Sequence, residues 1–116
     1  MKLWLMAALI ALMTVSAYPR AAKAIFFNGK DLLKHCEDES AFKKGLCIGF
    51  IAGASDSAEF TLSVFDKSIS LCIPEAVTVG QVKLVVNKYL KANPESLHES
   101  AAMSVALAIR EAWPCQ

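Results

Sequence analysis

Hydrophobic residues recur along this chain at the spacing of amphipathic helices, and no segment shows the strict alternation of apolar and polar residues that marks a strand. We therefore predict an all-α fold with four helical segments. The first segment spans residues 28–40 and opens at Asn28, a residue type that caps helix starts. Its apolar positions share one face, which comprises Leu32, Leu33 and Cys36.

The second segment, residues 41–65, carries a glycine at every fourth position, namely Gly45, Gly49 and Gly53. Glycine inside a helix costs about 1 kcal/mol relative to alanine, so three glycines need a compensating gain. We predict a continuous helix in which this glycine stripe allows close approach of another helix backbone. The alternative is a break near Gly53, in which case Asp56 would cap the restarted helix.

The third segment follows the longest irregular connection of the chain. Pro74 in this connection cannot continue a helix and favours an extended backbone at Ile73. We predict that the helix begins at Thr78, because Thr78 and Gln81 have the spacing of a capping box. Its apolar face then comprises Val82, Val85, Val86, Tyr89 and Leu90.

The fourth segment spans residues 95–113, after a stop at Asn93 and with Pro94 at a helix-start position. Its hydrophobic residues cover more than one side of the helix, because Met103, Ala106 and Leu107 widen the apolar stripe. A helix that is apolar on more than one side is either central in its fold or used in a second interface. A homodimer contact on this helix is therefore one expectation.

The first 24 residues have the layout of a secretory signal peptide, with an early lysine, an apolar run over residues 3–15 and small residues before two candidate cleavage sites. We favour cleavage after Ala24 over cleavage after Ala17, and the alternative is an uncleaved anchor. The apolar run is shorter than the roughly 20 residues of a membrane span, and no later stretch reaches that length. The sequence thus predicts one exported domain, residues 25–116, in a bacterial periplasm.

Removal of residues 1–24 takes away three bases and no acid, which changes the formal net charge from +1 to −2. A domain without a basic excess has no electrostatic footprint for nucleic acid. At about 90 residues its hydrophobic core is marginal, so covalent links would contribute strongly to stability.

All four cysteines, Cys36, Cys47, Cys72 and Cys115, follow the predicted cleavage site. An even number of cysteines in a small exported domain indicates a disulfide framework. If the helices run up, down, up and down, Cys36 and Cys47 fall at one end of the bundle and the other two cysteines at the opposite end. Cys47 and Cys72 then lie up to roughly 35 Å apart, whereas a disulfide needs Cα atoms within about 7 Å. We therefore predict a small four-helix bundle with the disulfides Cys36–Cys47 and Cys72–Cys115.

The sequence offers no arrangement of residues that supports catalysis, metal binding or a cofactor. Zinc ligands normally come in pairs such as C-x-x-C, whereas His35 and Cys36 are adjacent and point in different directions on a helix. A cysteine nucleophile needs a free thiol and a histidine base, and disulfides consume the thiols. A serine–histidine–aspartate triad around His98 lacks a nucleophile-elbow motif. We therefore predict that the protein is not an enzyme and holds no metal and no cofactor.

Several motifs follow one another in an order and spacing that resemble a known family. They are "CIGFIAGASD" (47–56), "CIPEAVTVGQ" (72–81), a Y-L-x-x-x-P-E turn, a following H-x-x-A-A and a closing aromatic-P-C. In these motifs the chain resembles the Rap/Tai family, which are immunity proteins for amidase effectors of bacterial type VI secretion. The resemblance covers nearly all of residues 25–116 and is weakest over residues 25–35.

The resemblance implies a periplasmic, all-helical, disulfide-bonded and often dimeric protein that binds a peptidoglycan amidase and blocks its cleft. In the family the connection between the third and fourth helices is implicated in binding, which places the contact here on Lys88, Lys91, Asn93, Glu95, Ser96, Leu97, His98 and Glu99. The residues themselves indicate a short, polar and stiff tip fixed by Pro94. The alternative is that this connection is an ordinary surface turn.

Two other functions remain open at this level. A small exported helical protein with disulfides is also typical of periplasmic chaperones and stress proteins, in which the apolar excess of the fourth helix would hold clients. The other function is the carriage of a small apolar ligand inside the bundle. The glycine stripe argues against a carrier if it closes space between helices. An orphan family member with a different partner is a further alternative.

Overall fold

The computed structural model of the chain describes residues 25–65 and 70–116. Four α-helices and one short 3-10 helix form within them: α2 (Gly29–Glu37), α3 (Ala41–Phe65), α4 (Val79–Ala92), η2 (Pro94–Ser96) and α5 (Ala101–Ala112). These residues contain no β-strand, only an isolated antiparallel bridge between Asn28 and Ser100. The predicted all-α fold is therefore confirmed. The predicted signal peptide, residues 1–24, lies outside the described residues.

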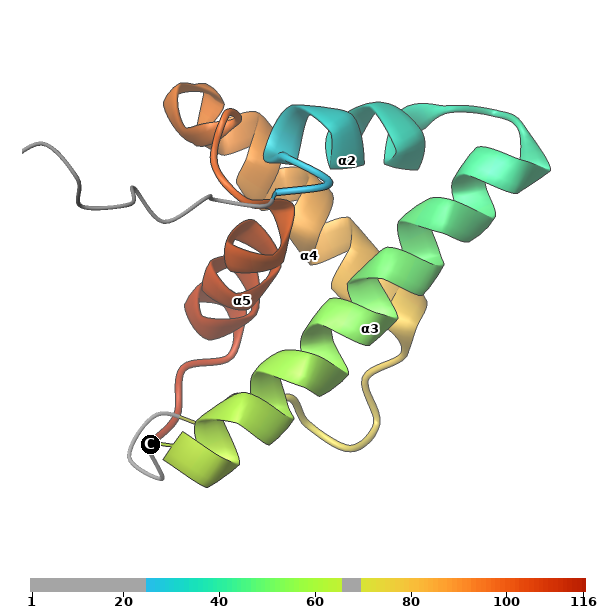
Figure 1. The fold of residues 1–116 in the computed structure, drawn as a ribbon. Helices are drawn as coiled ribbons and strands as arrows, with labels where there is room; N and C mark the ends of the chain where they lie inside the picture. The colour runs from blue at the N-terminus through green and yellow to red at the C-terminus, as the bar shows by residue number, and fades with distance from the viewer. Residues whose placement is uncertain (1–24, 66–69) are drawn as a thin grey trace, which may run out of the picture.

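The helices alternate in direction, as expected for a small bundle (Figure 1). The longest helix, α3, runs away from the end of the molecule where α2 lies, α4 returns toward that end, and α5 runs away from it again. The shortest α-helix, α2, lies across the end where α3 begins. This arrangement places the α4–α5 connection beside the start of α2 and the C-terminus beside the end of α3.

The four helices share one core, to which each contributes one apolar face. Ile51 of α3, Val86 of α4 and Ile109 of α5 are completely buried at its centre. Burial of an aliphatic side chain of this size contributes about 1.5–3 kcal/mol to stability. The remaining core residues are Leu32, Cys36, Cys47, Leu71, Val82, Leu90, Ala101, Val105 and Ala108.

Capping boxes fix the starts of α2 and α4. The backbone N–H of Asp31 donates to Asn28 Oδ1 (2.9 Å), and the Asn28 N–H donates to the Asp31 carboxylate. At the start of α4 the Thr78 N–H donates to Gln81 Oε1 (2.8 Å), and the Gln81 N–H donates to Thr78 Oγ1. The predicted starts at Asn28 and Thr78 are thus confirmed, because a cap depends only on neighbours in sequence.

Both predicted disulfides are present, at opposite ends of the molecule. Cys36–Cys47 joins α2 to α3 with Cα atoms 5.0 Å apart. Cys72–Cys115 ties the connection before α4 to the end of the chain, with Cα atoms 5.2 Å apart. The two bonds differ in environment, because Cys47 is completely buried whereas Cys115 is exposed.

The glycine stripe of α3 faces outward. The helix is continuous through Gly53, as predicted, and Asp56 is an exposed residue within it and caps no break. A Cβ atom added to Gly45, Gly49 or Gly53 would meet no heavy atom within 4 Å. The prediction that this stripe receives another helix is therefore wrong for the helices described in this chain. The reason is that α3 turns its opposite face, which holds Cys47 and Ile51, toward the core.

The predicted fourth helix, residues 95–113, is interrupted. Residues 97–100 are not helical, and α5 begins only at Ala101. In this interruption the Ala101 N–H donates to the Phe27 carbonyl, while the Lys30 N–H donates to the Leu97 carbonyl (2.9 Å). These bonds replace the helical bond that would join the Ala101 N–H to the Leu97 carbonyl. Pairing with the start of α2 therefore overrides the local helical pattern.

Candidate partner-binding surface

The residues predicted to contact a partner lie together at one end of the molecule. They occupy the last turns of α4, the 3-10 helix η2 and the residues before α5, and we call this stretch, residues 88–99, the tip (Figure 1). Lys88, Glu95 and His98 are exposed on it. Lys91 is also exposed, but its Nζ forms an ion pair with Glu37 of α2 (2.7 Å). These four side chains are the ones best placed to meet another protein.

Other predicted contact residues instead hold the tip in shape. The Asn93 side chain caps the end of α4 by donating to the Tyr89 carbonyl (2.8 Å). The Ser96 hydroxyl donates to the Asn93 carbonyl (3.0 Å). Leu97 is half-buried and packs against the core. The side chains of Asn93, Ser96 and Leu97 already bond to or pack against this protein. These three residues therefore maintain the shape of the surface and do not offer free groups to a partner.

The tip is fixed to α2 as well as to α4. The Gly29 N–H donates to the Glu99 carbonyl (3.0 Å), alongside the Lys30–Leu97 bond. Gly29 is buried, and a Cβ at this position would lie 3.0 Å from Leu90 Cδ2 and 3.3 Å from the Leu97 carbonyl oxygen. A side chain here would force Leu90 or the Leu97 backbone to shift by a few tenths of an ångström, so glycine favours this close approach. The sequence did not reveal this role, because Gly29 lies far from the tip along the chain.

Charges of both signs are mixed at the tip. His98 Nε2 lies 3.8 Å from a carboxylate oxygen of Glu99, and Glu95 and Lys88 stand in solvent. Exposed ion pairs such as Lys91–Glu37 contribute only about 0–1 kcal/mol to stability, so they are easily exchanged for pairs with a partner. This surface suits recognition by complementary charge around a rigid backbone.

A tightly bonded turn joins α2 to α3 beside the Cys36–Cys47 disulfide. The Ser40 N–H donates to the Asp38 carboxylate (2.8 Å), and Lys43 Nζ lies 3.0 Å from the same group. These interactions, led by the backbone hydrogen bond from Ser40, lower the pKa of Asp38 to about 2. The charged form of Asp38 therefore helps to hold α3 at its angle to α2.

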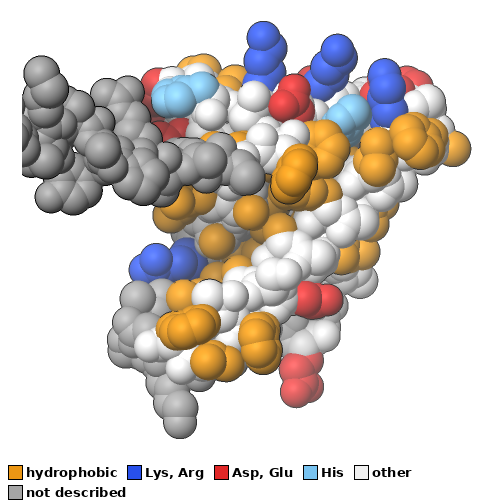
Figure 2. All heavy atoms as spheres, in the orientation of Figure 1, with side chains coloured by type: hydrophobic (Ala, Val, Ile, Leu, Met, Phe, Trp, Pro, Cys, Tyr) orange, Lys and Arg blue, Asp and Glu red, His pale blue; other side chains and the backbone are white. Residues whose placement is uncertain are grey.

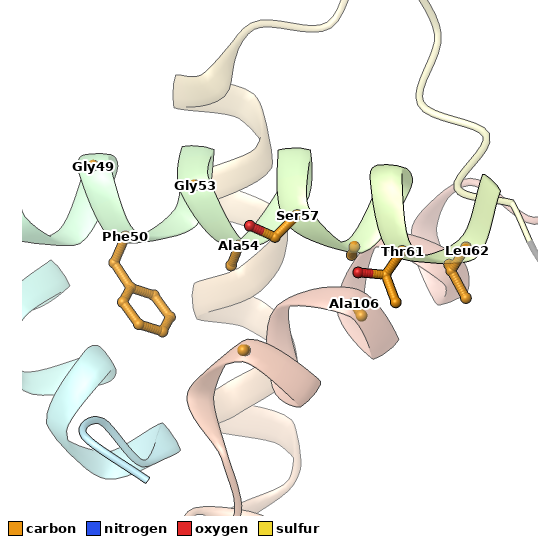
Figure 3. Close-up of a pocket in the computed structure, with 10 residues that line it drawn as sticks. Gly49, Phe50, Gly53, Ala54, Ser57, Thr61, Leu62 and Ala106 are labelled. Carbon is orange, nitrogen blue, oxygen red and sulfur yellow. The ribbon is translucent and has the colours of Figure 1, made fainter. Parts of the chain in front are cut away.

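A second surface, which sequence reasoning did not identify as a site, runs along α3. Two adjoining hollows of about 640 and 480 Å³ lie beside this helix, and both are lined by Gly49 and Phe50. Figure 3 shows Phe50, Ser57 and Thr61 projecting from α3 along the larger hollow, which Ala106 of α5 also lines. We call the two hollows the trough. Its full lining is Phe27, Ala41, Phe42, Gly45, Leu46, Gly49, Phe50, Gly53, Ala54, Ser57, Ala58, Thr61, Leu62, Ala102 and Ala106.

Large hydrophobic side chains stand exposed around the trough. Phe42 is 75% exposed and Phe65 is 82% exposed on α3, and Met103 is 54% exposed on α5. In Figure 2 hydrophobic side chains spread over this face, while cationic side chains line the edge formed by α2 and the start of α3. The sequence could not locate this face, because apolar spacing alone does not say which side of α3 is covered. The expectation that the glycine stripe closes space is therefore wrong within the described chain, since the stripe borders an open trough.

The described residues offer little for catalysis or metal binding. Within residues 25–65 and 70–116 no three His, Cys, Asp or Glu side chains gather as a metal site would require. Ser104 is buried and its hydroxyl donates to the Ser100 carbonyl, and His35 packs edge-on against Phe27 with its Nδ1 buried and without a hydrogen-bond partner. None of the helices in this part of the chain has the length and apolar character of a membrane span.

The geometry thus defines a small disulfide-bonded helical protein with two surfaces suited to protein contacts. Comparison with protein families identifies this class more closely, since the family model for Rap1a immunity proteins matches residues 28–115. The chain belongs to this family, and the resemblance to the Rap/Tai family is confirmed. Searches of curated proteins and of solved structures gave no match. The matched residues include both disulfides, the tip and α3.

Proposed function

We propose that this protein is a periplasmic immunity protein that binds a peptidoglycan amidase effector of a type VI secretion system and covers its active-site cleft. The observation that carries the proposal is the family match over residues 28–115. A rigid, exposed tip on the same chain supports it, because a cleft is blocked most simply by a protruding segment of fixed shape. The protein would act by binding alone, without catalysis.

The tip provides the physical means for such inhibition. Its backbone is fixed by hydrogen bonds to the start of α2, so little conformational entropy is lost when it enters a cleft. Lys88, Glu95 and His98 would recognise the rim of the cleft, with Lys91 and Glu99 beside them. Asn93, Ser96 and Leu97 would keep the inserted backbone in shape.

The proposal also includes export of the protein to the periplasm and its association with a second copy. Residues 1–24 would be removed after Ala24, or else after Ala17, and residues 25–116 would form a single domain in the periplasm. The two disulfides support this location, because they form and persist in oxidising compartments. We also propose that the mature protein is a homodimer, in line with the exposed apolar side chains of α3 and α5.

A periplasmic chaperone is the second candidate. The apolar trough and the exposed phenylalanines favour it, since chaperones hold unfolded clients on surfaces of this kind. A chaperone would suppress the aggregation of several unrelated proteins and would bind an apolar dye more strongly at low pH. An immunity protein would instead bind one hydrolase tightly and leave general aggregation unchanged.

Recovery of the natural partner tests the proposal. The protein carrying a C-terminal tag would be purified from the periplasm of its own cells, and any hydrolase recovered with it would be assayed on peptidoglycan. We expect one amidase, inhibited at equimolar protein, and we expect the protein to protect cells that export this amidase. Recovery of no hydrolase, together with absence of protection, would show that the immunity role is wrong.

A further inference from the structure

The trough along α3 is too apolar to be a surface that remains in water. Beside the exposed Phe42 and Phe65, Val64 is 57% exposed on α3 and Leu107 is 41% exposed on α5. Monomeric proteins rarely leave contiguous apolar patches larger than a few hundred Å² uncovered. A covered phenylalanine removes about 150–250 Å² from water, so Phe42 and Leu46, together with the apolar lining of the two hollows, would supply part of the roughly 800 Å² per partner of a stable interface.

The chemistry of the trough restricts what can cover it. None of the residues that line it carries a charge, so a charged partner surface would lose its water there without gaining a counter-charge. An anionic membrane is disfavoured too, because a helix that lies on membranes carries basic residues next to its apolar face. Next to this face the second half of α3 carries the exposed acids Asp56 and Glu59, and the lysines at its start, Lys43 and Lys44, are already paired with Asp38 and Glu39. Among the described residues, the exposed cation that remains nearby is Arg110, one turn after Ala106 on α5.

The trough has the symmetry that contact with a second copy needs. A two-fold contact joins the same patch of both copies, so the patch must complement itself. Gly49 belongs to both hollows and lies midway between Gly45 and Gly53 along the helix. If two α3 helices run antiparallel and cross at Gly49, Gly45 of one copy falls beside Gly53 of the other, and each smaller hollow meets the partner's larger one.

Large side chains of each copy would then find space in the other. Leu46 precedes the crossing point by three residues, so in an antiparallel pair it comes close to the level of Gly53 in the second copy. Gly53 has no heavy atom within 4 Å of its Cβ position, so it can accept a side chain. Phe42, one turn further away, reaches the larger hollow beyond Gly53, where Ser57 and Ala106 lie. In this register, each protruding side chain of one copy lies opposite a glycine or a hollow of the other copy.

We propose that two copies of this chain pair through the trough, with their α3 helices antiparallel and crossing at Gly49. The inference rests on the homodimer included in the proposed function, and the contact face and register are what it adds. The residues of the trough and those of the tip are separate sets, so pairing would leave both tips free to bind. The glycine stripe would thereby receive a helix backbone after all, from a second copy.

Matched glycine substitutions test the contact face. Gly49→Gln places a long uncharged side chain at the crossing point, whereas Gly80→Gln places the same side chain on the exposed start of α4. Neither should disturb the fold, because the added Cβ meets open space at Gly49 and only an ordinary 3.7 Å contact at Gly80. The full-length gene would be expressed with both disulfides formed, and dimer dissociation would be measured by analytical ultracentrifugation. We expect the dissociation constant to rise at least about 100-fold for Gly49→Gln and less than about twofold for Gly80→Gln.

Each of the other possible results of this experiment would contradict a different part of the proposal. A dimer that Gly49→Gln leaves intact, in protein whose circular dichroism is unchanged, would place the contact elsewhere while the homodimer stands. A wild-type monomer at tens of micromolar would overturn both the homodimer and this inference and would leave the immunity role standing. Loss of hydrolase binding in Gly49→Gln without loss of pairing would assign the trough to the toxin.

Cross-linking provides a check on the register. A residue at the crossing point of a two-fold pair faces its own counterpart, so Gly49→Cys should form a disulfide-linked dimer under mild oxidation, since Cα atoms within about 7 Å permit the bond. Gly80→Cys should remain unlinked. Mass mapping would verify that Cys36–Cys47 and Cys72–Cys115 are retained. Linkage of both variants at equal rates would show that the proposed register is wrong.

Discussion

Gly29 decides how closely the tip lies against α2. Its missing side chain leaves the space that Leu90 and the Leu97 carbonyl occupy. We expect Gly29→Ala to destabilise the protein by about 1–3 kcal/mol, although alanine is the better helix former, because the added methyl group overpacks a closed contact. Denaturant unfolding would measure the change.

Gly80→Ala is the matched control for this substitution. Gly80 is exposed near the start of α4, and a methyl group there makes only an ordinary contact. Its replacement should stabilise the protein, by no more than about 1 kcal/mol. Equal effects at Gly29 and Gly80 would contradict the close approach between α2 and the tip.

Asp38 gives the turn between α2 and α3 a dependence on pH. Because the pKa of Asp38 is lowered to about 2 in the folded protein, its charged form is favoured by folding. Its contribution to stability is complete above its ordinary value of 3.8 and is lost as the pH falls toward 2. We expect Asp38→Asn to be less stable than the wild type at neutral pH and to approach it as the pH falls to about 2.

Unfolding midpoints in denaturant, measured from pH 2 to 7, would follow this convergence. Glu75→Gln is a suitable control, because Glu75 is exposed in the connection before α4. A difference between the wild type and Asp38→Asn that stays constant over the whole range would show that the hydrogen bond from Ser40 does not stabilise the charged form.

At the scale of helices, the two disulfides hold different pairs of elements and should differ in reactivity. Cys36–Cys47 lies inside the contact between α2 and α3, where Cys47 has no exposed surface, whereas Cys115 is exposed at the end of the chain. A reducing thiol must reach a sulfur atom to attack it. We expect mild reduction to open Cys72–Cys115 first, as alkylation followed by mass mapping would detect.

The same two bonds differ in the length of chain that they close. Cys72–Cys115 spans 43 residues and Cys36–Cys47 spans 11, for which the chain-entropy model gives about 4 and about 3 kcal/mol. Selective reduction should therefore lower the free energy of unfolding markedly while α2 stays joined to α3. Simultaneous reduction of both bonds would contradict the difference in their burial.

At the scale of the whole molecule, substitutions in the tip should change partner binding without changing the stability of the fold. Lys88 and His98 are exposed, so Lys88→Glu combined with His98→Ala should leave the free energy of unfolding unchanged within about 0.5 kcal/mol. If the tip binds the hydrolase, this variant should weaken binding by at least about tenfold, or about 1.4 kcal/mol. Isothermal titration calorimetry with the recovered hydrolase would measure the affinity.

Arg110→Glu on α5 provides the control for this variant. Arg110 is exposed and lies outside the tip, so its reversal changes the net charge without touching the proposed contact. Affinity that falls equally in both variants would indicate a general effect of charge, and an unaltered affinity of the tip variant would move the binding surface away from residues 88–99.

Local features of this protein were determined by the sequence alone. The capping boxes at Asn28 and Thr78 bond to residues only three positions away, so their pattern is sufficient to predict them. The pairing of the cysteines was also predictable, because helices that alternate in direction place Cys36 and Cys47 at one end of the bundle and Cys72 and Cys115 at the other. The order and spacing of the family motifs are likewise properties of the sequence, and they were sufficient to indicate the class of protein.

Only the tertiary structure decided which faces are covered and where the last helix begins. Residues 97–100 have a helical pattern, but their backbone bonds to the start of α2, a contact between segments far apart in the chain. The glycine stripe of α3 was recognisable as a pattern, yet helical spacing cannot distinguish the face that reaches the core from the face that remains exposed. Long-range packing sets these features, because it is the competition between apolar faces for one small core that determines which of them remains exposed.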